Sequence, residues 1–151
     1  MAKKITKFHL VLLSILVIVL IYYSTYRGIV LSNTAITEID SITKFTSGGP
    51  QTLVIGRDKA DDKKAVWFFK RNIQGVAYLK NMISKEDARL IAVDHGLIDE
   101  DLFLELRYFE NPTDVLERVG PYWVARDRGS ILVYIDPYTG DSTLRNTGPV
   151  D

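Results

Sequence analysis

The sequence predicts an α+β protein, in which an N-terminal transmembrane helix is followed by two tandem units, each a helix packed on an antiparallel sheet. Three observations lead to this fold class. A long uncharged apolar segment lies near the start, short strand-like stretches separated by turn signals follow it, and a tryptophan-containing hairpin recurs after 56 residues. With 151 residues, the chain has room for one domain of usual size or two very small ones.

The apolar segment FHLVLLSILVIVLIYY occupies residues 8–23 and contains no charged residue. It reaches 22 residues when Ile5 and Tyr26 are taken as its limits, and about 20 apolar residues are needed to cross the hydrocarbon core of a bilayer. A cleaved signal peptide is the alternative, but it requires a shorter apolar core and a site of small residues, whereas YYSTYRG follows here. We therefore predict an uncleaved single-pass anchor.

Charged and aromatic residues on the two sides of the segment predict its orientation. Lysine favours the cytoplasmic side, and tyrosine rings favour the membrane interface. We expect a cytoplasmic tail at 1–7, an anchor at 8–26 and an extracytoplasmic domain after it, with His9 at the interface and not a ligand. The lysines are Lys3, Lys4 and Lys7, and the tyrosines are Tyr22, Tyr23 and Tyr26.

The composition excludes several classes of site and partner. The chain contains no cysteine, which excludes disulfides, thiolate metal sites and thiol nucleophiles. Beyond the three N-terminal lysines, 16 Lys and Arg face 19 Asp and Glu, a net charge of −3. A nucleic-acid-binding module is expected to present a basic face instead, so we expect no nucleic-acid partner.

The first unit is assigned to residues 27–82. Apolar residues recur every three to four positions over 27–42, which predicts a helix that continues from the membrane. The turn signal SGGP at 47–50 follows, and three strands come after it with a charged loop and a tight turn between them. The strands are 52–58, 65–71 and 75–81, and their connections are 58–64 and 72–75.

The second unit, residues 83–151, begins with a helix whose two ends are clearly signalled. Ser84 is the N-cap, and Asp87 three positions later completes a variant of the capping box. His95 lies in the last turn, and Gly96 is the left-handed stop. The strands that follow are 102–109, 121–128, 130–136 and 141–146, with a turn at 111–114 and a stretch at 115–119 that fits a helical turn or a loop.

An internal repeat supports the division into two units. Shifting the chain by 56 residues places residues 65–79 over 121–135, Trp67 over Trp123 and Tyr78 over Tyr134. The same shift places a helix at 28–40 over the helix at 84–96. Units of this size approach the lower limit for an independent core, so we expect them to share an interface and form one rigid body. The paired rings are expected to fill the core, and a repeated ligand-stacking site is the alternative.

Two short stretches allow a cation site. Asp58, Asp61 and Asp62 lie close together in the charged loop, but the lysines beside them favour a solvated loop. The stretch IDPYTGD, which ends at Asp141, places two aspartates around a glycine. Its proline and glycine favour a hairpin turn, and its few oxygen ligands fall short of the six or more that calcium takes. We therefore predict no metal site and no cofactor.

A hydrolase would need a nucleophile with a base, a metal, or two positioned carboxylates. His95 is the one histidine beyond the apolar segment, and an imidazole there suits the helix C-terminus, whereas a catalytic base would need a partner. A carboxylate pair stays open as the enzymatic alternative. Acidic residues for such a pair are scattered over 58–62, 86–87, 99–101 and 110–117.

Three stretches of the second unit resemble the PepSY-like pattern: ISKEDARLIA, YWVA and YIDPYTGD. With a short N-terminal tail, one predicted span and two such units, the whole chain resembles the YpmB/TseB-like cell wall elongation regulators of Gram-positive bacteria. That family has a duplicated cystatin/PepSY-type fold. The first unit departs from the pattern, because its hairpin ends in YLKNMISKE and lacks the Asp-x-x-Thr-Gly turn.

The resemblance implies a non-enzymatic, extracytoplasmic accessory protein that is held at the cell membrane and regulates peptidoglycan elongation by binding a penicillin-binding protein. It transfers no catalytic, cofactor-binding or metal-binding residue, it implies no small-molecule substrate, and it leaves the binding face unassigned. An alternative implied by some PepSY domains is an inhibitor or chaperone-like module that acts on an exported protease.

Overall fold

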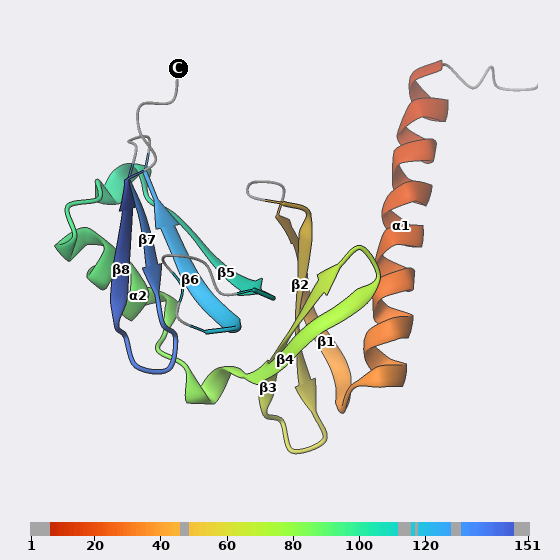
Figure 1. Cartoon of the computed structure of the whole chain (residues 1–151). Coiled ribbons are helices and arrows are strands. Elements are labelled where there is room, and N and C mark those ends of the chain that lie inside the picture. Colours follow the sequence, from red (N-terminus) through yellow and green to blue (C-terminus); the bar gives the residue numbers. More distant parts are fainter. Residues whose placement is uncertain (1–6, 46–48, 112–115, 117, 128–130, 147–151) are drawn as a thin grey trace, which may run out of the picture.

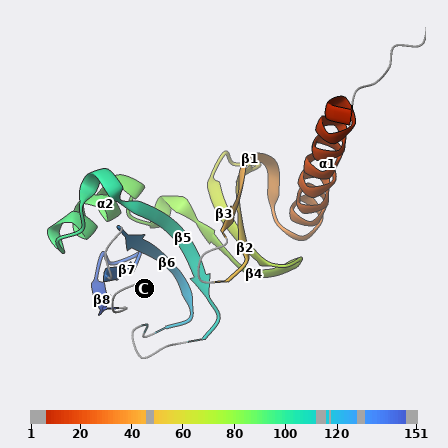
Figure 2. The same cartoon turned by 90° about the horizontal axis from the view of Figure 1, so that it is seen from above.

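The computed structural model describes residues 7–45, 49–111, 116, 118–127 and 131–146 (Figure 1). In this part of the chain, two four-stranded antiparallel sheets each follow a helix, so the α+β class is confirmed. Helices α1 and α2 lie at opposite ends of the molecule, with the two sheets between them (Figure 2).

Helix α1 spans Lys7–Asn33 and is long and apolar enough to cross a membrane. Most of its side chains up to Ile21 are exposed, whereas Tyr26 and Val30 near its C-terminal end are buried against the first sheet. The ring of Tyr26 meets that of Phe68 edge-on, with centroids 5.2 Å apart. The helix therefore has an exposed apolar portion, and its last two turns belong to the folded domain.

The helix predicted over 27–42 is wrong beyond Asn33, because Ile36–Phe45 forms strand β1. Two register shifts along β1, each equivalent to one extra residue, alter the usual alternation of strand faces. As a result Ile36, Ile39 and Ile42, spaced by three, all pack in the cluster with α1. A bulged strand has here produced the spacing that is typical of a helix.

Sheet 1 has the strand order β1–β2–β3–β4, where β2 is Gln51–Asp58, β3 is Lys63–Phe69 and β4 is Asn72–Tyr78. Its two faces serve different cores. Val54, Val66 and Phe68 face α1, while the alternate residues Leu53, Ala65 and Trp67 join the core shared with the second half of the molecule. Sheet 1 is thus buried on both sides.

The tight turn predicted at 72–75 lies instead at Lys70 and Arg71, between β3 and β4. Lys70 has φ 57°, the left-handed conformation that a two-residue hairpin requires. One extra residue in β4 shifts the register between Trp67, which pairs with Gly75, and Phe68, which pairs with Ile73. The glycine that suggested a turn is therefore in the strand.

Helix α2, Lys85–Asp94, begins and ends as predicted. Asp87 N donates to Ser84 Oγ over 3.1 Å and Ser84 N donates to Asp87 Oδ2 over 3.2 Å, so the capping box is confirmed. His95 is the C-cap residue, Gly96 follows with φ 87°, and Leu97 N donates back to the helix. Short 3₁₀ turns flank this helix at Leu79–Asn81 and Asp99–Asp101.

Sheet 2 has the order β5–β6–β7–β8, with β5 at Phe103–Phe109, β6 at Gly120–Arg126, β7 at Ile131–Ile135 and β8 at Ser142–Asn146. One face packs against α2 and sheet 1. The other face carries a smaller cluster in which Leu116 lies against Tyr122 and Tyr134. Most of the predicted turn at 111–114 and much of the 115–119 stretch lie outside the described residues.

The predicted repeat matches two hairpins, but these are not equivalent in the two sheets. Strand β3 is the third strand of its sheet, whereas β6 is the second, and β1 and β8 are added on opposite sides of the matched strands. The predicted superposition of a helix at 28–40 on that at 84–96 is also wrong, since Ile36–Phe45 is a strand. The 56-residue shift therefore aligns two hairpins in sequence, but Trp67 pairs with Gly75 whereas Trp123 pairs with Ile135, so the strand registers differ.

Candidate binding groove between the two sheets

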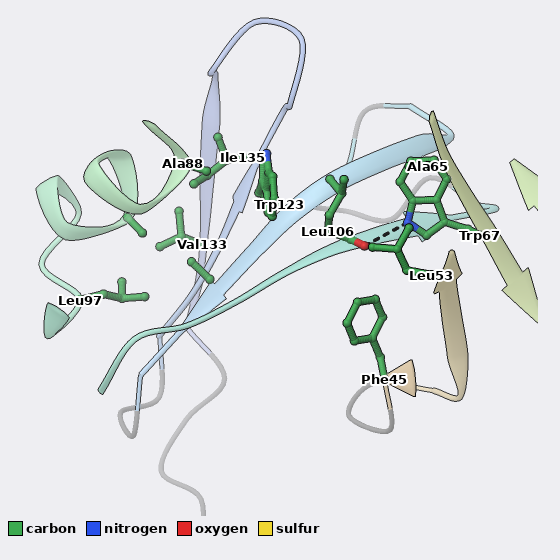
Figure 3. Close-up of a cluster of buried hydrophobic side chains, with 12 residues drawn as sticks. Phe45, Leu53, Ala65, Trp67, Ala88, Leu97, Leu106, Trp123, Val133 and Ile135 are labelled. Carbon is green, nitrogen blue, oxygen red and sulfur yellow. Dashed lines mark hydrogen bonds between the residues drawn. The ribbon is translucent and has the colours of Figure 1, made fainter. Parts of the chain in front are cut away.

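Hydrogen bonds between side chain and backbone join the two sheets. Trp67 Nε1 donates to Leu106 O over 3.0 Å at a fully buried position (Figure 3). The Gln51 side chain donates to Tyr108 O over 2.8 Å and accepts from Tyr108 N over 2.9 Å, so it extends β5 as a neighbouring strand would. These contacts hold the two sheets in a fixed relation, and the shared interface expected from the sequence is confirmed.

A buried ion pair lies beside this junction. Arg107 and Glu105 on β5 are both buried, with 3.8 Å between Nη1 and Oε2, and Arg107 Nη2 donates to Gly49 O over 2.9 Å. Burial lowers the pKa of Arg107 from its ordinary value, although a guanidinium stays charged at physiological pH. The pair connects the segment before β2 to sheet 2.

An apolar groove of about 460 Å³ lies where the two sheets meet the connection to α2. Thr43 lies at its exposed edge on β1, and Ser84 at the start of α2 also lines it. Phe45, Leu53, Leu106 and Trp123 converge on the space between the sheets (Figure 3). Its walls include Phe45, Leu53 and Ile55 from sheet 1 and Leu104, Leu106 and Trp123 from sheet 2.

Trp123, one of the residues that line the groove, also contains a buried polar group. The side chain is 9% exposed, and its Nε1 is buried without a hydrogen-bond partner among the described residues. A buried donor left unpaired costs about 1–3 kcal/mol. An acceptor that entered the groove and reached Nε1 would recover part of that cost. The arrangement suits an apolar peptide side chain next to a backbone carbonyl.

A comparison with solved structures finds the YpmB protein from Bacillus subtilis at 22% identity, with a TM-score of 0.64, over 83% of this chain and 96% of that one. The two proteins share a fold. No family model matches the chain, and no curated protein matches it. The groove, built from both sheets, therefore belongs to an architecture that occurs in another protein.

The acidic loop between β2 and β3 pairs its carboxylates with cations. Lys64 lies 3.0 Å from Asp58, Arg57 lies 2.9 Å from Asp61, and Lys80 lies 2.6 Å from Asp62. No cluster of metal-ligating side chains occurs within the described ranges. The geometry favours the ion-paired loop over the cation site.

The Asp58–Lys64 pair predicts a component of stability that depends on pH. Its hydrogen bond to Lys64 lowers the pKa of the Asp58 carboxyl, so the pair stabilises the fold above the unfolded value of about 3.9. That component is lost as the pH falls through the folded-state pKa. Thermal unfolding at a series of pH values should show Asp58→Asn less stable than wild type near neutrality, with the difference shrinking below about pH 4. A difference that stays constant at all pH values would contradict this.

The IDPYTGD stretch is a hairpin turn between β7 and β8, as predicted. Asp136 N donates to Asp141 O over 2.7 Å, Tyr138 N donates to Asp136 Oδ1 over 2.8 Å, and Gly140 has φ 80°. Asp136 also lies 2.8 Å from Arg118, whose guanidinium lies near the ring of Tyr138. A polar hollow of about 450 Å³ adjoins this turn, but the charges of Asp136 and Arg118 in it already neutralise each other.

His95 has a partner that the sequence did not reveal. Its Nε2 lies 2.6 Å from Ser142 Oγ on β8. In a serine nucleophile, the histidine base must be oriented by a third group, usually a carboxylate. Among the described residues, no carboxylate forms a hydrogen bond with the His95 imidazole. The contact ties the end of α2 to the edge of sheet 2.

The structure separates the paired aromatic residues. Trp67, Trp123 and Tyr134 are buried, as expected for core residues, whereas Tyr78 is 38% exposed and lies beneath the Lys64 ammonium, 4.4 Å from it. The groove residues were not predicted as a site. Ile55 and Leu104 lie in stretches whose sequence is that of ordinary strands. Among the lining residues, Trp123 stands out because its buried Nε1 has no hydrogen-bond partner in the described part of the chain.

Proposed function

We propose that the protein is a membrane-anchored, extracytoplasmic binding module that docks a segment of a penicillin-binding protein and thereby regulates peptidoglycan elongation. The observation that supports this most directly is the groove, whose mostly apolar lining includes Trp123, a residue whose buried Nε1 has no hydrogen-bond partner among the described residues. It lies in a domain that continues from α1, a helix of sufficient length and apolarity to span a bilayer. The chain shares its fold with the YpmB protein, and the role in wall elongation rests on the motifs that resemble the YpmB/TseB-like regulators.

Attachment to the same membrane strengthens binding at a groove whose affinity is low in solution. When two proteins share a membrane, the second contact behaves as an intramolecular event, with an effective concentration in the millimolar range for short flexible links. A shallow apolar contact that would be too weak in solution then suffices. Regulation in this proposal acts by positioning the partner enzyme and requires no chemistry from the module.

Capture from membranes tests the groove. A photoreactive amino acid at Ile55 should crosslink a membrane protein that is also labelled by fluorescent penicillin. In that background, Thr43→Glu places a charge at the exposed edge of the groove, and we expect capture to fall by about tenfold because a desolvated charge opposes docking. Thr37→Glu is the matched control, since Thr37 lies on the same strand, is exposed and is outside the groove lining.

Other outcomes have distinct meanings. Equal capture by the Thr43 and Thr37 variants would rule out the groove as the docking face. Crosslinking of an exported protease in place of a penicillin-labelled protein would support the inhibitor or chaperone-like alternative. Release of the chain from membranes by alkaline carbonate would show that α1 does not anchor the protein in the bilayer.

A further inference from the structure

A second hollow, of about 370 Å³, lies between helix α1 and the β3–β4 hairpin. Ile18 and Ile21 on α1 form an apolar wall, and both are more than half exposed. Lys70 and Arg71 at the hairpin tip form the opposite side, and both are exposed. The hollow is therefore apolar on one side and cationic on the other.

The hairpin is fixed in this position. Tyr26 on α1 is buried, and its hydroxyl donates to Lys70 O over 2.6 Å. Lys70 itself holds the left-handed conformation at φ 57°. The backbone at the hairpin tip, from which the two basic side chains extend, is consequently held beside the helix.

The depth of the hollow along α1 matches a membrane interface. Tyr23 and Tyr26 mark the level where tyrosine rings favour the headgroup region. Ile18 lies eight residues earlier, which at the helical rise is about 12 Å further into the hydrocarbon. Lys70 and Arg71 line the same hollow as Ile18. Their long side chains can extend from that depth toward the headgroups.

We infer that this hollow binds one anionic phospholipid, with its phosphate against Lys70 and Arg71 and an acyl chain along Ile18 and Ile21. This rests on the proposed insertion of α1 in a membrane. The described residues that line the hollow contribute two cations and no carboxylate, which favours a net negative headgroup over a zwitterionic one. Arginine pairs with phosphate through two parallel hydrogen bonds, and lysine adds a point charge.

A bound lipid would orient the extracytoplasmic domain. The hairpin belongs to sheet 1, whose other face contributes to the core shared with sheet 2 and α2. Holding the tip of this hairpin at the headgroups therefore fixes the direction in which the groove opens relative to the bilayer. The anionic lipid acts in this way as a positioning ligand for the whole domain.

The test compares lipid selectivity of the full-length chain reconstituted in phosphatidylcholine vesicles that contain a minor fraction of phosphatidylglycerol. Electron paramagnetic resonance of spin-labelled phosphatidylglycerol and phosphatidylcholine reports which lipid is immobilised by the protein. We expect wild type to prefer phosphatidylglycerol by on the order of tenfold, from two basic residues near an anionic headgroup. Lys70→Asn with Arg71→Gln should remove the part of the preference that the hollow contributes, while Lys3, Lys4 and Lys7 keep their own contribution. Asparagine tolerates the left-handed conformation of Lys70.

Lys59→Asn with Lys63→Gln is the matched control, because it removes the same charge at the opposite end of β3. Retained selectivity in the Lys70/Arg71 variant, or equal loss in both variants, would overturn the inference. If the double variant fails to fold, Arg71→Gln alone should still lose about half of the preference on a logarithmic scale. Carbonate extraction of wild type tests the anchor separately, so an inserted protein without selectivity refutes the lipid site and leaves the proposed function standing.

Discussion

Replacement of Trp67 by phenylalanine is expected to lower the free energy of unfolding by about 2–3 kcal/mol. Trp67 is fully buried, and its Nε1 donates to Leu106 O across the junction of the two sheets. The smaller ring leaves a cavity and also removes the partner of a buried carbonyl. The contact between the rings of Trp67 and Tyr108, whose centroids lie 5.7 Å apart, is weakened as well.

Trp123→Phe is the matched control for this change. It replaces the indole of a second tryptophan in the same core by a smaller ring. The Nε1 of Trp123, however, has no hydrogen-bond partner among the described residues. We therefore expect a loss smaller by about 1–2 kcal/mol, which is the contribution of the missing hydrogen bond and the orphaned carbonyl. Urea unfolding of the full-length chain in mild detergent, followed by circular dichroism, measures both. Equal losses would show that the hydrogen bond between the sheets does not stabilise the fold.

The elements that the sequence predicted best are those with local signals. The capping box at Ser84 and the left-handed stop at Gly96 depend on neighbouring residues only, and both are present in the structure. The error at β1 has a physical cause. Two bulges place Ile36, Ile39 and Ile42 on one face, and a spacing of three cannot by itself distinguish a bulged strand from a helix.

The groove and the lipid hollow had no local signal. Phe45 and Trp123 line one groove although 78 positions separate them in the chain. Ile18 and Lys70 line one hollow, beside the point where Tyr26 holds the hairpin against α1. Both sites arise from packing between elements whose individual patterns are those of ordinary strands and an apolar helix. The sequence contained the chemistry of each site, but tertiary structure brought it together.

Gly75→Ala is expected to destabilise the protein by about 1–3 kcal/mol, although alanine normally suits a strand better than glycine does. A Cβ at Gly75 would overlap the ring of Tyr108, with Cδ2 and Cζ only 2.8 Å away. That ring cannot move aside freely, because it packs on Trp67 while Gln51 holds its backbone from both sides. The methyl group therefore pushes the two sheets apart.

A double-mutant cycle shows whether this steric contact is the cause. Tyr108→Leu removes the ring, so Gly75→Ala in that background should cost less than about 0.5 kcal/mol, and the coupling energy should fall in the range seen for residues in contact. Gly28→Ala serves as the control, because nothing lies within 4 Å of its added Cβ and alanine favours a helix. If Gly75→Ala costs the same with and without the Tyr108 ring, the junction of the sheets tolerates the methyl group and the loss originates within β4. If the free-energy changes of the two substitutions simply add, the defect lies within one strand; if they do not add, it lies in the interface that shapes the groove.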